Sequence, residues 1–125
     1  MEGQTVPQEE YKHYLDVEDV LKRVGGNRVI LTTLLKKFMN GSEEETLKAA
    51  LANYSADTFA DAKAAAHTIK GLAANLSMPA LRDAAFNLEM AVKEGGEPGD
   101  LPDAVYQARA KTVYVIEAML ASGEI

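Results

Sequence analysis

Apolar residues recur along most of the chain at steps of three and four, which is the spacing of one face of an α-helix. The pattern first predicts a short amphipathic helix over residues 15–24, ended by the glycine pair at 25–26. Asn27 is then a suitable N-cap for a second helix over residues 28–39. Both helices are expected to follow a polar N-terminal lead-in over residues 1–14.

The pattern slips at residues 40–42, where the sequence reads Asn-Gly-Ser. Phe38 and Leu47 are both apolar, yet at about 100° per residue they would point to opposite sides of one straight helix. Ser42 and Glu45 have the spacing of a capping box, which marks the start of a helix. A break is therefore expected here, with a new helix starting at Ser42.

The most regular apolar seam lies in the middle of the chain. Asp57 is a candidate cap for this central helix, which is expected to stop near Ser77. Proline is tolerated only in the first turn of a helix, so the following helix should begin just before Pro79. Ser77 is then its candidate cap. The seam that should face inward consists of Phe59, Ala62, Ala66, Ile69, Ala73 and Leu76.

Two further helices complete the pattern. The first follows Pro79 and ends at the glycine pair at 95–96. The second begins after Asp100, its predicted cap, with Pro102 in its first turn. The side of the first helix that should be buried consists of Leu81, Ala85, Leu88 and Val92.

No segment shows the sustained period-two alternation of a β-strand, so the pattern predicts an all-α protein. Short turns join the helices, and such turns make helices that follow each other in the chain run antiparallel. We therefore expect a single domain over residues 15–122, an up-and-down antiparallel four-helix bundle with a short N-terminal capping helix. Irregular gaps in its core are expected to be filled by Met78, Met90 and Met119.

Composition narrows the possible functions. The 125 residues carry a net charge of −6, with 13 Lys and Arg against 19 Asp and Glu. This balance argues against nucleic-acid binding, because phosphate contacts need a basic patch. No stretch is apolar enough to span a membrane, and the chain has no cysteine for a disulfide or a thiolate metal site. A cytoplasmic monomer that binds neither membrane nor metal is expected.

One of the two histidines lies in an unusual setting. On the helical wheel His67 is about 130° from the inward seam, so its ring is expected on the outer side of the central helix. Gly71, one turn later, costs about 1 kcal/mol relative to alanine, and close approach by another molecule is the simplest reason for it. The other residues of this face that a partner would contact are Ala60, Lys63, Ala64 and Ala74.

The residues around His67 favour nucleophilic chemistry. A neutral imidazole has a free ring nitrogen at cytosolic pH and can attack phosphorus, forming a phosphoramidate that can pass the group on. Lys70 would bring positive charge to the phosphoryl oxygens, while Gly71 would leave room for the donor. An inert surface histidine is the simpler alternative.

The segment AAHTIKGLAANL, residues 65–76, resembles the signature of the histidine-containing phosphotransfer (HPt) domains of two-component phosphorelays. That signature is a histidine, any residue, an aliphatic residue, a lysine and a glycine. Two further segments are similar to neighbouring parts of the family, in the same order: LDVEDVLKRVGGNRVILTTLLKKF at 15–38 and LRDAAFNLEMAVKEG at 81–95. Leu72 and Ser77 depart from the family, which usually has serine and glycine there.

The resemblance implies that His67 accepts a phosphoryl group from the aspartyl phosphate of a response-regulator receiver domain and passes it to another receiver aspartate. It implies that Lys70 supports the phosphoryl group and that Gly71 admits the partner. A hybrid histidine kinase is a further candidate partner. No cofactor is expected on this chain, and Mg²⁺ is expected on the partner receiver domain. Family members carry the group without ATP-dependent kinase activity, and this chain has no glycine-rich phosphate loop.

Two other interpretations remain open. The first is a non-catalytic helical adaptor that binds a partner through the Ala- and Gly-rich face around His67. The second is a module that keeps the family's fold and has lost transfer competence, although the presence of both His67 and Lys70 speaks against it.

Overall fold

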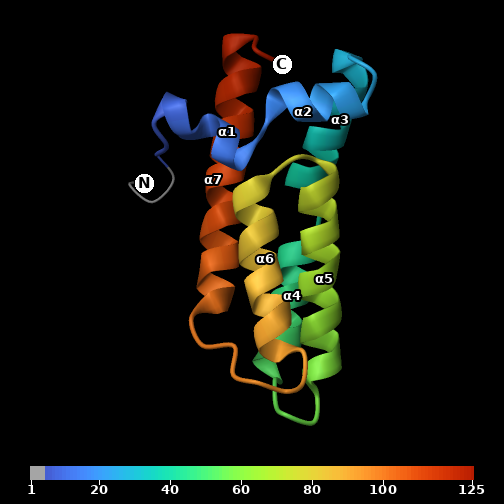
Figure 1. Cartoon of the computed structure of the whole chain (residues 1–125), viewed down its shortest axis with the longest axis vertical. Coiled ribbons are helices and arrows are strands. Elements are labelled where there is room, and N and C mark those ends of the chain that lie inside the picture. The colour runs from blue at the N-terminus through green and yellow to red at the C-terminus, as the bar shows by residue number, and fades with distance from the viewer. Residues whose placement is uncertain (1–4) are drawn as a thin grey trace.

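The computed structural model describes residues 5–125, which form helices and no strand, as predicted for an all-α protein. Figure 1 shows the long helices running along one axis and the shorter N-terminal ones lying across one end. No helix among the described residues is both long and apolar enough to cross a membrane. The elements are a 3-10 turn η2 (Gln8–Glu10) and the helices α1 (Tyr11–Tyr14), α2 (Val17–Arg23), α3 (Arg28–Met39), α4 (Glu43–Ala52), α5 (Phe59–Asn75), α6 (Pro79–Val92) and α7 (Leu101–Ser122).

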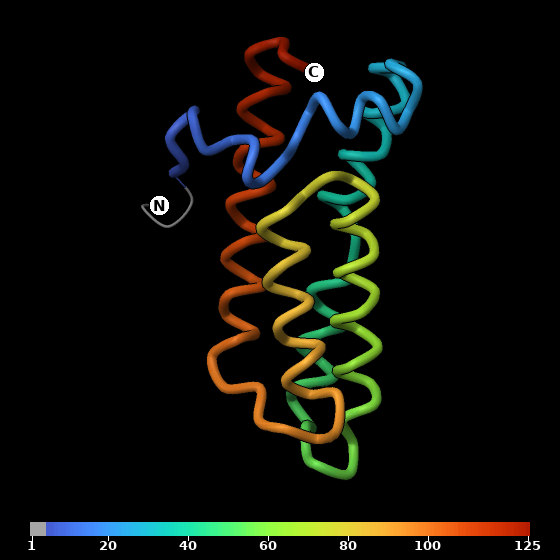
Figure 2. Tube along the Cα trace, in the orientation of Figure 1, coloured from blue at the N-terminus to red at the C-terminus, as the bar shows by residue number. Residues whose placement is uncertain are grey.

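Helix α5 lies between two neighbours, α4 and α6, and α6 packs in turn against α7. Figures 1 and 2 show that the chain reverses direction between α5 and α6 and again between α6 and α7. The inward side of α5 is made largely of alanine, which lets the adjacent helices approach closely. Ala62, Ala66, Ile69 and Ala73 are all buried, so the predicted seam is confirmed, and only Phe59 at its start is half-buried.

The predicted break after Phe38 is present, and it separates α3 from α4. Asn27 caps α3 as expected, since its Oδ1 accepts the backbone N–H groups of Val29 and Ile30, each at 3.0 Å. The predicted start at Ser42 is also confirmed, since Ser42 holds the N-cap position of α4, but its side chain makes no capping hydrogen bond. The cap predicted for α5 is wrong, because this helix begins after Thr58 and not after Asp57.

The N-terminal lead-in contributes to the core. Val6 is buried, and Tyr11 and Tyr14 of α1 pack against the core, where α1 contacts α6 and α7. The few apolar side chains of this otherwise polar segment thus pack against the long helices. Two of the three methionines predicted in the core, Met78 and Met119, are buried there. The third, Met90, is exposed, so its predicted place was wrong.

Ser77 joins α2 to the turn between α5 and α6. Its φ of 57° lies in the left-handed region that favours glycine. Its hydroxyl donates to Asp19 Oδ2 at 2.6 Å, and its carbonyl accepts the backbone N–H of Asp16 at 2.9 Å. The prediction that Ser77 caps α6 was therefore wrong, because Met78 holds the cap position and the serine hydroxyl is bound to α2.

We expect Asp19 to make stability depend on pH. Hydrogen bonds from Ser77 and Arg23 hold the pKa of this carboxyl below its ordinary value. A lowered pKa means that ionised Asp19 stabilises the fold above its unfolded pKa of about 3.9, and that the contribution is lost as pH falls through the folded pKa. Urea unfolding of wild type and Asp19→Asn should therefore give a constant difference in free energy above about pH 5 and a shrinking one below about pH 4. A constant difference through the acid range would contradict this assignment.

Candidate functional site

His67 lies on the outer side of α5, with 64% of its side chain exposed. Its place on the wheel, away from the alanine seam, is therefore confirmed. One ring nitrogen faces the protein: Nδ1 lies 2.8 Å from Oε2 of Glu89 on α6. The ring is thus held from one side by the neighbouring helix and open to solvent on the other.

Glu89 brings a carboxylate into the interface between α5 and α6. Only 12% of its side chain is exposed, because the residue falls four positions after Ala85 and three before Val92, both on the buried side of α6. Its second oxygen, Oε1, lies 2.7 Å from Nζ of Lys70. A buried charge needs a partner of opposite charge or several hydrogen bonds. Each oxygen of Glu89 accordingly faces one residue of α5, His67 or Lys70.

The carboxyl group of Glu89 is kept ionised by these contacts. Burial alone would raise the pKa of Glu89, but the contacts from Lys70 and then His67 outweigh burial, and the pKa is lowered. Oε1 is fully buried and has no hydrogen bond of regular geometry, so the positive charge of Lys70 is what compensates it. An ionised carboxylate can only accept, so Nδ1 of His67 must be the donor. Whenever the ring is neutral, Nε2 then carries the free lone pair.

Lys70 differs from its predicted setting. The helical wheel placed it on the outer face beside His67, whereas its side chain is half-buried against α6. Its ammonium group pairs with Glu89 and also lies 5.7 Å from the centre of the Phe86 ring, within cation–π range. Lys70 therefore contributes to the packing of α5 on α6 and also places a positive charge near His67.

Gly71 has open space where a side chain would be. A Cβ built at this position would meet no atom within 4 Å outside its own helix backbone. Packing inside the protein therefore gives no reason for glycine in this helix. The open space is compatible with the predicted steric role.

The other residues predicted to contact a partner are mostly placed around a hollow beside His67. Ala60 and Ala64 are exposed, Lys63 is half-buried, and all three line this hollow together with His67 and Glu89. Ala74, also half-buried, is not part of its lining.

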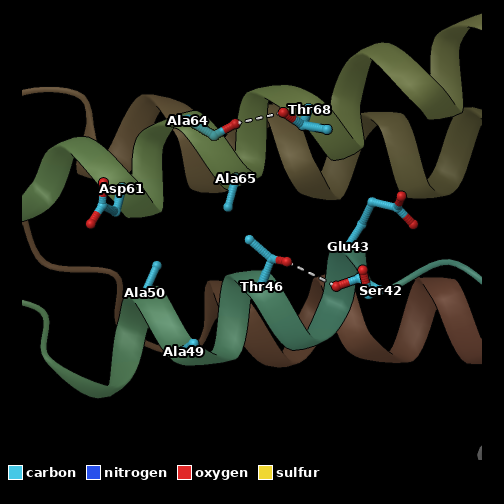
Figure 3. Close-up of a pocket in the computed structure, with 9 residues that line it drawn as sticks. All are labelled: Ser42, Glu43, Thr46, Ala49, Ala50, Asp61, Ala64, Ala65 and Thr68. Atoms are coloured by element: carbon cyan, nitrogen blue, oxygen red, sulfur yellow. Dashed lines mark hydrogen bonds between the residues drawn. The ribbon is translucent and has the colours of Figure 1, made fainter.

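A second hollow lies between α4 and α5, on the other side of Ala64 (Figure 3). The hydroxyl of Thr68 donates to the carbonyl of Ala64, and that of Thr46 to the carbonyl of Ser42, each at 3.0 Å within its own helix. The groove thus has mostly small side chains along its walls, with the carboxylates of Glu43 and Asp61 among them. The groove is lined by Ser42, Glu43, Thr46, Ala49, Ala50, Asp61, Ala64, Ala65 and Thr68.

Glu89 was not identified as a site residue from the sequence, although a signal for it exists. It follows Leu88 at a position of α6 that the three- and four-residue spacing assigns to the buried side. A charged residue at such a position must be paired. The sequence does not show which residue pairs with it, because the contact joins positions 22 apart on two helices.

Fold and site together define a class: an all-helical protein with an exposed histidine that contacts a buried carboxylate and lies beside a lysine and an open glycine. Comparison with known families agrees with this description. The model of the Hpt domain matches residues 33–122, which is most of the chain. The chain belongs to the Hpt domain family. Searches of curated proteins and of solved structures found no match.

Proposed function

We propose that this protein is a phosphorelay carrier in which His67 accepts a phosphoryl group from a receiver-domain aspartyl phosphate and passes it to another receiver aspartate. Hpt domains are phosphotransfer carriers of phosphorelays, not kinases. The observation that carries the assignment to His67 is its ring geometry. Nδ1 faces the carboxylate of Glu89, so in the neutral ring Nε2 carries the free lone pair, and 64% of the side chain is exposed.

The proposed step needs no base. The lone pair of Nε2 attacks phosphorus, the N–P bond forms, and the P–O bond to the aspartyl oxygen breaks. The bonding pair leaves with the aspartate, which becomes a carboxylate. The proton on Nδ1 stays in place, so the ring becomes positively charged and Glu89, already ionised, stabilises that charge. Reversal of the same step returns the group to a second receiver.

Lys70 is proposed to support the transferred phosphoryl group. Its ammonium lies one helical turn from His67 and is held at 2.7 Å from Glu89. An ammonium on a flexible stem can be shared between this carboxylate and the incoming phosphoryl oxygens.

We further propose that α3 with α4, α5, α6 and α7 form the four antiparallel positions of an Hpt bundle. The chain would act as a monomer without a cofactor, and the Mg²⁺ would be bound by the receiver.

The wild-type chain provides the direct test. Incubation with a phosphorylated receiver domain should transfer label to the chain. The label should be lost in acid and kept in base, as expected for phosphorus on nitrogen. An acid-stable label, or no label from any receiver tested, would contradict the proposal. A hybrid histidine kinase that carries its own receiver is a suitable first donor.

Substitutions of Gly71 distinguish an effect on stability from an effect on partner access. Nothing obstructs a Cβ there, so Gly71→Ala should raise the free energy of unfolding by about 0.5–1 kcal/mol. Gly71→Arg should also fold, but its side chain should lower the rate of transfer from a receiver by tenfold or more. Urea unfolding and a transfer time course measure the two effects. Unchanged transfer to Gly71→Arg would show that the partner does not approach this side of α5.

A further inference from the structure

Large apolar side chains are exposed at two places among residues 5–125. Val29 and Ile30 lie in the first turn of α3, at the end of the molecule that also carries the C-terminus (Figure 1). Phe86 and Met90 lie one turn apart on α6, and 46% of each is exposed. We call Phe86 and Met90 the α6 stripe. Exposing an aromatic ring and a methionine side by side on a small protein calls for an explanation.

The α6 stripe adjoins the phosphotransfer site. Phe86 stacks under the ammonium of Lys70, whose nitrogen lies 5.7 Å from the ring centre. Lys70 and His67 in turn contact the two oxygens of Glu89. Met90 directly follows Glu89 in the chain. The stripe is thus a direct extension of the residues that hold the imidazole.

We propose that the α6 stripe is the apolar anchor on which a receiver domain docks when it reaches His67; this rests on the proposed function. Transfer requires the partner's phosphorus about 3–3.5 Å from Nε2, so the partner's surface must be centred there. A standard interface covers about 800 Å² on each side, equivalent to a disc of about 16 Å radius. The contacts that lead from His67 through Glu89 and Lys70 to the ring of Phe86 place the stripe beside this centre. The partner is therefore a receiver that presents an apolar side chain next to its phosphorylated aspartate.

The stripe suits this role better than the groove between α4 and α5. That groove offers small side chains, which bury little apolar area, together with the carboxylates of Glu43 and Asp61. Binding energy in interfaces is concentrated in a few large side chains, and aromatic rings are prominent among them. Methionine adds an adaptable contact that tolerates partners of different shape. A carrier that must meet both a donor and an acceptor needs such tolerance.

The experiment compares two matched pairs of substitutions. Phe86→Ser with Met90→Ser removes the stripe, and Val29→Ser with Ile30→Ser removes the other exposed pair. The probe is the receiver domain that labels wild type fastest. Loss of the stripe should raise the half-saturating receiver concentration by about tenfold to thirtyfold, with the maximal rate within about threefold. The control pair should behave as wild type.

A protein-free donor distinguishes this inference from the proposed function. Phosphoramidate can transfer its phosphoryl group to an imidazole with release of ammonia, so it reports the reactivity of His67 alone. Both double variants should react with it at the wild-type rate. If the receiver labels the stripe variant with unchanged half-saturation, the stripe is not the anchor although His67 is the acceptor. Met90→Ser alone, which leaves the Phe86–Lys70 contact in place, should show a smaller rise in half-saturation.

Two other outcomes would overturn the inference. If the stripe variant loses maximal rate, or reacts poorly with phosphoramidate, then Phe86 acts by holding Lys70 and not by binding a partner. If wild type is a dimer by sedimentation and the stripe variant a monomer, then a second copy of this chain covers the stripe.

Discussion

A His67→Gln chain is expected to take up no label from a phosphorylated receiver under conditions in which wild type is fully labelled. Glutamine keeps a polar side chain of similar reach, and its amide nitrogen is no nucleophile for phosphorus. Because most of the His67 side chain is exposed, the free energy of unfolding should change by no more than about 1 kcal/mol. Loss of label together with an intact fold would assign the acceptor to this residue.

The second histidine is the natural control for this experiment. His13 is exposed in α1 and touches Tyr14 edge-on, with no carboxylate contact among the described residues. His13→Gln should be labelled like wild type. Retained labelling of His67→Gln would refute the assignment. A different result would identify the helical adaptor that the sequence also allows: wild type takes up no label, and wild type and His67→Gln bind a receiver equally well.

Replacement of Glu89 should produce the second large effect. Glu89→Ala removes both the acceptor that fixes the ring and the negative charge that stabilises the phosphorylated ring. Loss of one preorganised electrostatic partner at a reacting centre typically slows the reaction by about 10²- to 10³-fold. Glu89→Gln can still accept from Nδ1 but lacks the charge, so we expect a smaller loss, of about tenfold. A stopped-flow or quenched transfer assay at saturating receiver concentration measures the transfer rates of both variants.

A merely structural role for Glu89 predicts a different set of results. It would lower the fraction of folded protein and leave the rate per folded molecule unchanged. The ¹⁵N chemical shifts of His67 provide an independent reading, since they report which ring nitrogen carries the proton. In wild type the proton should be on Nδ1, and Glu89→Ala should redistribute it while Glu89→Gln should not. Equal ring shifts in all three chains would contradict the orienting role.

Loss of Lys70 should destabilise the fold more than loss of the charge on Glu89. Lys70→Met leaves the buried carboxylate oxygen without its counter-charge, which should destabilise the fold by about 1–3 kcal/mol. Glu89→Gln leaves only a lysine that can extend into water, and should cost less. The helical wheel alone puts Lys70 on the outer face of α5, where a lysine would contribute little to packing. The difference arises because Glu89 reaches it from a second helix, a contact that no helical wheel of α5 can contain.

The local pattern of apolar residues was sufficient to predict most of the helices and the outward direction of His67. The seam of α5 repeats regularly enough to show which face is buried, and the break after Phe38 follows from angular arithmetic within one segment. Asn27 was predicted correctly as a cap because its two partners, Val29 and Ile30, lie only two and three positions later in the chain. Such features depend on neighbours in sequence only.

Features that join distant segments were predicted poorly. Ser77 has the right chemistry for a cap, but Asp19 of α2 takes its hydroxyl, and sequence alone cannot weigh a partner 58 positions away. Met90 was placed in the core because methionine usually is, while its actual direction follows from how α6 rotates against α5. Glu89 was missed for the same reason. In each case packing between helices decided the result.

The side chains proposed to react, assist and orient all come from α5 and α6, two consecutive helices joined by the short turn at 76–78. This helical hairpin is therefore a portable unit. Transplanted into an unrelated scaffold, it should bring the histidine, its acid and its lysine in their correct relative positions, provided that the host covers the alanine side of α5 and the leucine side of α6. The remaining helices could then be exchanged to suit a chosen partner without redesigning the chemistry.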